Sequence, residues 1–171
     1  MLPPGHIAGG FLAAKIASHF IPELDHSKYL LLSSFFGFFP DLDFFFAFFK
    51  AKKFISREDI NHRQFVTHAP LLYLVVFTAL YSFPNLRLFA WTFILGTWSH
   101  FLLDSISSVG IAWLYPFTSK LYNKTWDSRI AISEQGFLKH WTTFVREYMK
   151  IFSFKAEMAI ILVAILVYWY S

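Results

Sequence analysis

The 171-residue sequence contains no cysteine, and only 15% of its residues are charged. The lack of thiols excludes disulfides, a thiolate metal site and a cysteine nucleophile, so any metal ion must be bound by histidine and carboxylate. The chain also lacks a glycine-rich phosphate loop and a serine in a nucleophile-elbow context. No basic stretch precedes the first apolar segment, and we therefore expect no cleaved signal peptide.

Apolar residues dominate what is present: 56% of the chain is hydrophobic and 23 residues are phenylalanine. A soluble domain carries about 25% charged residues, and a single domain of this length cannot hide so many aromatic rings. The net charge of +4 could indicate nucleic-acid binding. However, the lysines and arginines lie between apolar segments, as in the cytoplasmic loops of membrane proteins. The sequence therefore predicts one all-α, polytopic membrane domain over 1–171 that contacts lipid and binds no nucleic acid directly.

The apolar segments predict about four to six membrane-associated helices. We expect 106–117 to be re-entrant or interfacial and 118–155 to form an amphipathic helix. Pro40 should break the second segment, and Thr67 is expected to cap the third, with Pro70 in its first turn. The segments cover residues 6–21, 29–49, 69–83, 88–104, 106–117 and 156–170.

The distribution of positive charge predicts the orientation. The connector 50–67 contains five lysines and arginines and 118–155 contains seven, whereas the turn 84–87 contains one. The positive-inside rule then places the connector and 118–155 in the cytoplasm and the turn outside. We expect a multi-pass protein of the inner (cytoplasmic) membrane.

Two carboxylates, Asp41 and Asp43, interrupt a phenylalanine run in FFGFFPDLDFFFAFF. A carboxylate in apolar surroundings must neutralise, pair with a cation or bind a metal. One of the two could bind an ion directly while the other orients a histidine or caps the helix; a loop dipping into the headgroups is the alternative. The predicted topology brings further polar residues to the same cytoplasmic depth: His6, His62, His68, His100 and Asp104.

Two of the motifs have spacings suited to metal binding. In WSHFLLDS, His100 and Asp104 are four residues apart on one helix face and could bind one ion, although a simple Asp–His hydrogen bond would fit too. In NHRQFVTHA, His62 and His68 could serve one ion, and Arg63 has the geometry to hold a phosphate or carboxylate. A solvated polar loop is the alternative for this second motif. The remaining histidines, His19, His26 and His140, fit no cluster.

The motifs GHIAGG, FPDLD, HRQFVTH and GTWSHFLLDSISSVGIAWLYPF occur in this order along residues 1–117. In this region the chain resembles the LexA-binding, inner-membrane-associated metal-dependent hydrolases, which are distantly similar to zinc-dependent phospholipases C. No motif from 118 onward contributes to the resemblance. It implies that Asp104 bridges two ions and that His6 helps to bind the second. His100, Asp43 or Asp41, and His62 or His68 would complete the ligands of one ion.

The resemblance implies an enzyme with one or two divalent ions, for which we expect Zn²⁺. A site near the headgroups makes a phospholipid phosphoester the expected substrate, with Asp43, Arg63 and His68 as catalytic residues. Two other classes of function stay open. Intramembrane Asp and His also occur in ion or proton transporters. A non-catalytic scaffold that binds a soluble regulatory protein is the other possibility.

Overall fold

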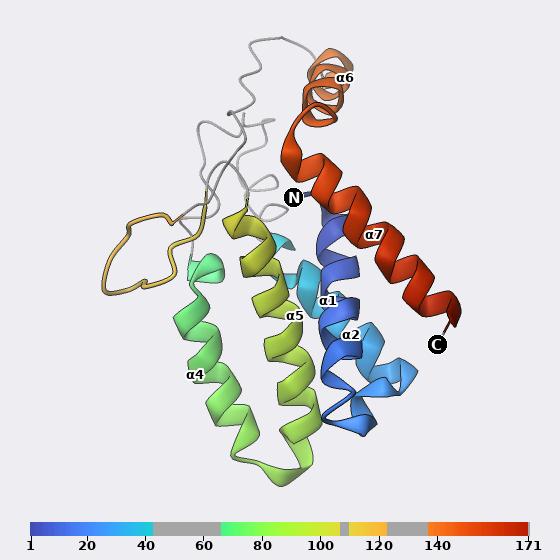
Figure 1. The fold of residues 1–171 in the computed structure, drawn as a ribbon. Helices are drawn as coiled ribbons and strands as arrows, with labels where there is room; N and C mark the ends of the chain where they lie inside the picture. Colours follow the sequence, from blue (N-terminus) through green and yellow to red (C-terminus); the bar gives the residue numbers. More distant parts are fainter. Residues whose placement is uncertain (43–65, 107–109, 123–136, 171) are drawn as a thin grey trace.

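The computed structural model describes residues 1–42, 66–106, 110–122 and 137–170 (Figure 1). Within these residues the chain is helical and forms no strand, apart from an isolated bridge between Ile111 and Tyr122. The all-α prediction is therefore confirmed for the described part. The helices are α1 (Pro3–Ala17), α2 (Ser27–Phe38), α4 (Pro70–Tyr81), α5 (Arg87–Ser105), α6 (Phe137–Tyr148) and α7 (Phe152–Tyr170). Short 3₁₀ turns are η1 (Pro22–Asp25), η2 (Phe39–Asp41), η4 (Val66–His68) and η5 (Pro84–Leu86).

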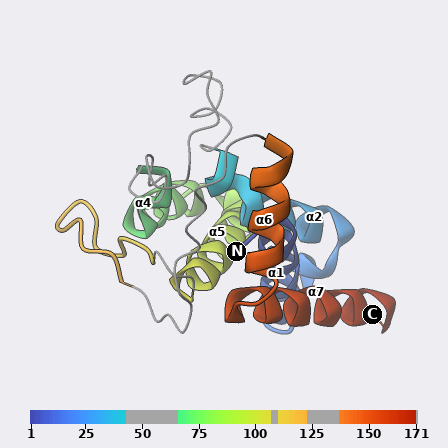
Figure 2. The same ribbon diagram turned by 90° about the horizontal axis from the view of Figure 1, so that it is seen from above.

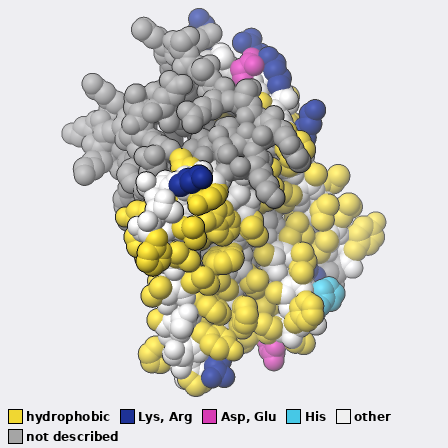
Figure 3. Space-filling model, turned by 60° about the vertical axis from the view of Figure 1, so that its left-hand side comes forward, with side chains coloured by type: hydrophobic (Ala, Val, Ile, Leu, Met, Phe, Trp, Pro, Cys, Tyr) yellow, Lys and Arg dark blue, Asp and Glu magenta, His cyan; other side chains and the backbone are white. Residues whose placement is uncertain are grey.

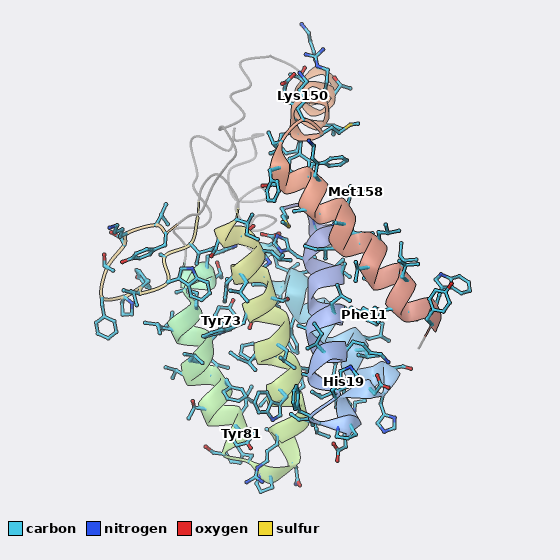
Figure 4. The ribbon with its side chains drawn as sticks, viewed as in Figure 1. Phe11, His19, Tyr73, Tyr81, Lys150 and Met158 are labelled. Atoms are coloured by element: carbon cyan, nitrogen blue, oxygen red, sulfur yellow. The ribbon has the colours of Figure 1, made fainter. Side chains whose placement is uncertain are left out.

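Two helical hairpins form the bundle. Helices α1 and α2 are joined through η1, and α4 and α5 through η5, with both connections at the lower end in Figure 1. Helix α5 packs against α1, α2 and α4. Helix α7 runs along one side of the bundle against α1, and α6 lies beyond the upper end (Figures 1 and 2). The ring of Phe11 on α1 meets Tyr168 of α7 at 6.3 Å between centroids, so the two helices stay in contact far from α6 (Figure 4).

Aromatic rings fill the space between α4 and α5. Tyr73 of α4 stacks on Phe93 at 5.4 Å and meets Phe101 edge-on at 5.0 Å, both on α5. Tyr73 projects from α4 toward α5 in Figure 4. Phe36 of α2 extends the same cluster through its edge-to-face contact with Phe93 at 5.2 Å. Such pairs add about 0.5–1.5 kcal/mol beyond the burial of their area, and they hold α4, the helix that follows His68, firmly against α5.

Glycines allow α1, α2 and α5 to approach each other closely. A Cβ atom on Gly10 would lie 2.3 Å from the carbonyl oxygen of Ser33, and one on Gly96 would lie 2.4 Å from the same oxygen. On Gly37 it would lie 2.3 Å from the carbonyl oxygen of His6. Small residues at helix contacts are typical of membrane bundles, in which close packing is a main source of helix association. The spacing of the three helices is thus set by positions where a side chain cannot fit.

Many apolar side chains face outward. Figure 3 shows hydrophobic side chains over most of one face of the bundle, with lysine and arginine side chains near its upper and lower ends. On α7, exposed residues include Leu162, Ile165 and Leu166, and the aromatic residues Tyr168 and Trp169 stand near its end. Exposed apolar surface of this extent marks a contact with lipid or a partner, and the aromatic end suits a membrane interface.

The described helices include fewer candidate spans than the four to six membrane-associated helices that the sequence predicts. Two are long and apolar enough to cross a membrane, Pro84–Ser105 with 22 residues and Phe152–Tyr170 with 19. Helix α4 is apolar but has 12 residues, and α1 has 15. At 1.5 Å per residue these are about 18 and 22 Å long, short of the ~30 Å hydrocarbon core. Hydropathy overestimates spans here because short helices that pack on one another are also apolar.

The structure also tests the expected helix boundaries. Helix α2 ends at Phe38 and Pro40 lies in η2, which confirms the predicted break. The N-cap of α4 is Ala69, not Thr67, because Thr67 belongs to the preceding turn η4; Pro70 is in the first turn as predicted. The described part of 106–117 contains turns, with Ile111 buried.

Candidate metal centre

Five ionisable side chains from four parts of the chain meet at the upper end of the bundle. His6 lies in the first turns of α1, Asp41 at the end of η2, and His68 at the end of η4. His100 and Asp104 lie one turn apart near the end of α5. The side chains of His6, His68, His100 and Asp104 are fully buried, whereas Asp41 is 15% exposed. The cluster therefore reaches its surroundings through Asp41.

The carboxylate of Asp104 lies between two imidazoles. Its Oδ1 is 3.4 Å from His6 Nε2, and its Oδ2 is 3.7 Å from His100 Nε2. His6, His100 and Asp104 together form one group able to hold a metal ion. The rings of His6 and His100 stack at 3.8 Å, which keeps the two imidazoles side by side.

Asp41 forms the second group with His68 and His100. Its Oδ1 is 3.7 Å from His68 Nε2 and 3.8 Å from His100 Nε2, and the two histidine nitrogens are 3.4 Å apart. The other oxygen of Asp41 is 3.8 Å from His6 Nε2. His100 belongs to both groups and is thus the centre of the cluster.

The ring of His100 is held in one orientation. Its Nδ1 lies 2.8 Å from the carbonyl oxygen of Gly37. A carbonyl only accepts, so Nδ1 carries the proton and donates it, and the lone pair of Nε2 points into the cluster. Metal-binding histidines are commonly oriented by such a backbone bond. Because the missing Cβ of Gly37 also allows the contact with His6, one residue serves both packing and the site.

The spacing of the ligand atoms fits a small divalent cation. Zinc binds histidine nitrogen and carboxylate oxygen at about 2.0–2.2 Å, so its ligands in a tetrahedron lie roughly 3.3 Å apart. The N–O and N–N separations of 3.4–3.8 Å in the cluster are slightly longer than this. A small inward movement of the side chains would be enough to enclose an ion.

His6 supplies an independent indication that the cluster needs a cation. Both of its ring nitrogens are buried and have no hydrogen-bond partner among the described residues. A buried polar atom without a partner costs about 1–3 kcal/mol, and a coordinated ion would remove that cost at Nε2. Asp104 also accepts a hydrogen bond from a cationic group, the amino group of Met1, at 2.9 Å. The residues present therefore fit a cation.

Three of the predicted site residues, Asp43, His62 and Arg63, lie outside the described residues. The structure brings the other five together in one cluster at the upper end of the bundle. Of the alternatives left open by the sequence, Asp41 and His68 are the members seen in the cluster. Which of the residues bind an ion stays a prediction.

Sequence reasoning missed Glu157, the single acidic residue of α7. Its side chain is buried, and it accepts hydrogen bonds from the backbone N–H groups of Leu2 at 3.3 Å and Gly5 at 3.1 Å. The hydroxyl of Tyr148 donates to the same carboxylate. An acid in an otherwise apolar helix was the available signal, because such residues are retained for a specific partner.

The turn that carries His68 is held by Tyr73. Its hydroxyl donates to the carbonyl oxygen of Thr67 at 2.9 Å. Tyr73→Phe should therefore lower the free energy of unfolding by about 0.5–1.5 kcal/mol and weaken zinc binding, because His68 loses its support. Thermal unfolding in detergent and zinc titration measure the two effects. Tyr81→Phe at the other end of α4 is the matched control, and equal behaviour of the two variants would contradict the assignment.

Fold and site together define an all-helical membrane protein with a buried histidine–aspartate cluster at one end of its bundle. The chain belongs to the YdjM inner membrane protein family, whose model matches residues 1–171. The match extends beyond residues 1–117, which carry the resemblance to the LexA-binding, metal-dependent hydrolases, and it supports the expected location in the inner membrane. LexA binding and metal-dependent hydrolysis stay predictions. Neither the curated proteins nor the solved structures gave a match.

Proposed function

We propose that the protein is a membrane-bound metal-dependent hydrolase that cleaves a phosphoester, such as a phospholipid headgroup, with a metal-activated water. The observation that carries the proposal is the meeting of three imidazoles and two carboxylates in one cluster, with four of these side chains fully buried. Buried charges of this kind are normally paired or bind metals. An apolar bundle has no structural need for such a cluster, since apolar side chains would pack there at a lower desolvation cost.

The ligand types favour zinc, because histidine and carboxylate without cysteine are the donors of many catalytic zinc sites. When bound, Zn²⁺ lowers the pKa of a coordinated water toward about 7 and so makes a nucleophile available at neutral pH. Asp41 and Asp104 supply the negative charge that holds the cation, and the Gly37 carbonyl orients His100. His68 is available as a further ligand or as the acceptor of a proton from water. Asp43 and Arg63 would assist at the substrate phosphate.

The position of the cluster supports a substrate at the cytoplasmic membrane surface. The chain leaves the upper end of the bundle after Leu42 and returns there at Val66, and this connector contains five lysines and arginines in 50–67. Seven more follow in 118–155, whereas Lys15, Lys28 and Arg87 are the three found elsewhere. By the positive-inside rule the end with the cluster faces the cytoplasm. Asp41, the partly exposed member, would then lie where headgroups can reach it.

A transporter is less well supported. A proton or ion pathway needs ionisable groups at several depths of the bilayer. In the described part of the chain, the buried histidine and acidic side chains all lie at the upper end of the bundle: His6, His68, His100, Asp104 and Glu157. This arrangement fits a site at one surface better than a path across the membrane.

Metal analysis of the detergent-purified protein tests the proposal. We expect about one or two zinc ions per chain, together with hydrolysis of phospholipids in mixed micelles that a chelator abolishes and zinc restores. Asp104→Asn should lose both, since the amide is a far weaker ligand than the carboxylate. Asp25→Asn, which alters an exposed carboxylate paired with Lys15, is the matched control. Metal-free wild-type protein with an intact fold would overturn the proposal and favour the scaffold.

A further inference from the structure

We propose that Glu157 is a positioning residue for the metal site, which it serves together with Tyr148 by fixing the first turn of α1 and with it His6. The inference rests on the proposed function and goes beyond it. Neither Glu157 nor Tyr148 is a ligand in the cluster. Both come from the C-terminal part of the chain, outside the motifs that carry the resemblance.

The hydrogen-bond pattern at the start of α1 shows why the helix needs this glutamate. The first four N–H groups of a helix have no partner within it. Here the residues concerned are Leu2, Pro3, Pro4 and Gly5. The two prolines have no N–H to satisfy, and Glu157 accepts a hydrogen bond from Leu2 through Oε2 and from Gly5 through Oε1. The N–H of Gly5 is shared with the carbonyl oxygen of Leu2 at 3.1 Å, whereas Glu157 is the acceptor for the N–H of Leu2. Its negative charge also suits the positive end of the helix dipole.

Glu157 also packs closely against the start of α1. A Cβ atom on Gly5 would lie 2.7 Å from Cγ of Glu157, so only glycine lets the carboxylate reach both N–H groups. The hydroxyl of Tyr148 donates to Oε2 from the end of α6, and the Tyr148 ring stacks on Phe144 at 5.6 Å. Glu157, Tyr148 and Gly5 are all buried. The carboxylate is therefore fixed from both sides.

This fixed turn leads directly to the cluster, because His6 follows Gly5. His6 Nε2 lies 3.4 Å from Asp104 and 3.8 Å from Asp41. Loss of the glutamate would leave the N–H of Leu2 without its acceptor and the N–H of Gly5 with only the Leu2 carbonyl, and the first turn would loosen. The imidazole of His6 would then leave its place beside Asp104, although the other four members of the cluster would stay.

The full-length protein in detergent allows a direct test. We expect Glu157→Gln to raise the dissociation constant for Zn²⁺ by about 10–100-fold, the range typical of residues that hold a metal ligand in place. Tyr148→Phe should raise it less, up to about 10-fold. Glu147→Gln is the control, because the Glu147 carboxylate pairs with Lys150 at the surface. This variant should bind zinc like the wild type. Faster hydrogen exchange in a peptide covering residues 2–6 of Glu157→Gln would report the loosened turn.

Two further measurements separate positioning from a general loss of stability. The visible spectrum of bound Co²⁺ should change in Glu157→Gln toward that of His6→Ala, because both lose the same ligand. In the His6→Ala background, Glu157→Gln should weaken zinc binding no further. An unchanged spectrum and zinc affinity in Glu157→Gln, with a wild type that binds zinc, would overturn this inference alone. A wild type that binds no zinc would overturn the proposed function and this inference together.

Discussion

His100→Ala should reduce zinc affinity by more than about 100-fold, since even the outer partners of metal ligands are worth 10–100-fold. The residue belongs to both ligand groups of the cluster, and its Nε2 is the nitrogen within 3.4–3.8 Å of His68, Asp41 and Asp104. Among the described histidines, His100 alone belongs to both groups. Zinc titration by competition with a chromogenic chelator measures the effect, and hydrolysis should fall with it.

The variant also removes the hydrogen bond to Gly37, so its fold needs a control. His100→Gln keeps an amide donor for that carbonyl but removes the imidazole, and it should fold better than His100→Ala while binding zinc as poorly. His19→Ala changes a histidine near the opposite end of α1 and should leave zinc binding unaltered. If both His100 variants retain the zinc affinity of the wild type, the cluster is not a metal centre.

Gly37→Ala should destabilise the bundle by about 3 kcal/mol, the upper part of the usual range for overpacking. The added methyl carbon would lie 2.3 Å from the carbonyl oxygen of His6 and 3.3 Å from Cα of Gly10, and both are backbone atoms. Backbone atoms cannot rotate away, so α1 and α2 would have to separate. Zinc binding should weaken too, because the Gly37 carbonyl orients His100. Unfolding in a denaturing detergent, followed by circular dichroism, measures the stability change.

Gly9→Ala is the matched control for this prediction. Its methyl would lie 2.6 Å from Cδ1 of Leu103, the far end of a flexible side chain that can turn aside. Alanine also favours the helix by about 0.5–1 kcal/mol over glycine, so the net change should be small. Equal destabilisation by the two substitutions would contradict the idea that Gly37 sets the approach of the helices.

Much of the site could be predicted from the sequence because its carboxylates lie in apolar stretches, where their desolvation costs free energy. Asp41 lies among phenylalanines and Asp104 one turn after His100, and a carboxylate in such surroundings requires a cation. The expected hairpins then bring these residues to one end. Asp41 and His68 are the members that the structure places in the cluster, whereas Asp43 and His62 lie outside the described residues, so the choice between them stays a prediction.

Other features depend on contacts that the sequence does not encode locally. The described helices include fewer candidate spans than the predicted membrane-associated helices, because α1 and α2 are apolar where they pack on each other and on α5, and α4 where it packs on α5. Glu157 lies more than 150 residues from the N–H groups that donate hydrogen bonds to it, and no periodicity links such distant positions. The role of Gly5 depends on that contact as well, and the sequence alone shows only a glycine after two prolines.

The order of the helices along the chain has a consequence for biogenesis. His6, Asp41, His68, His100 and Asp104 all emerge from the ribosome before Glu157, the residue that steadies the first of them. A nascent chain that has just inserted α5 already holds the whole cluster but leaves its N-terminal turn loose. Insertion of α7 is then the event that fixes this turn, and a zinc ion acquired earlier would be held less tightly than one acquired afterwards.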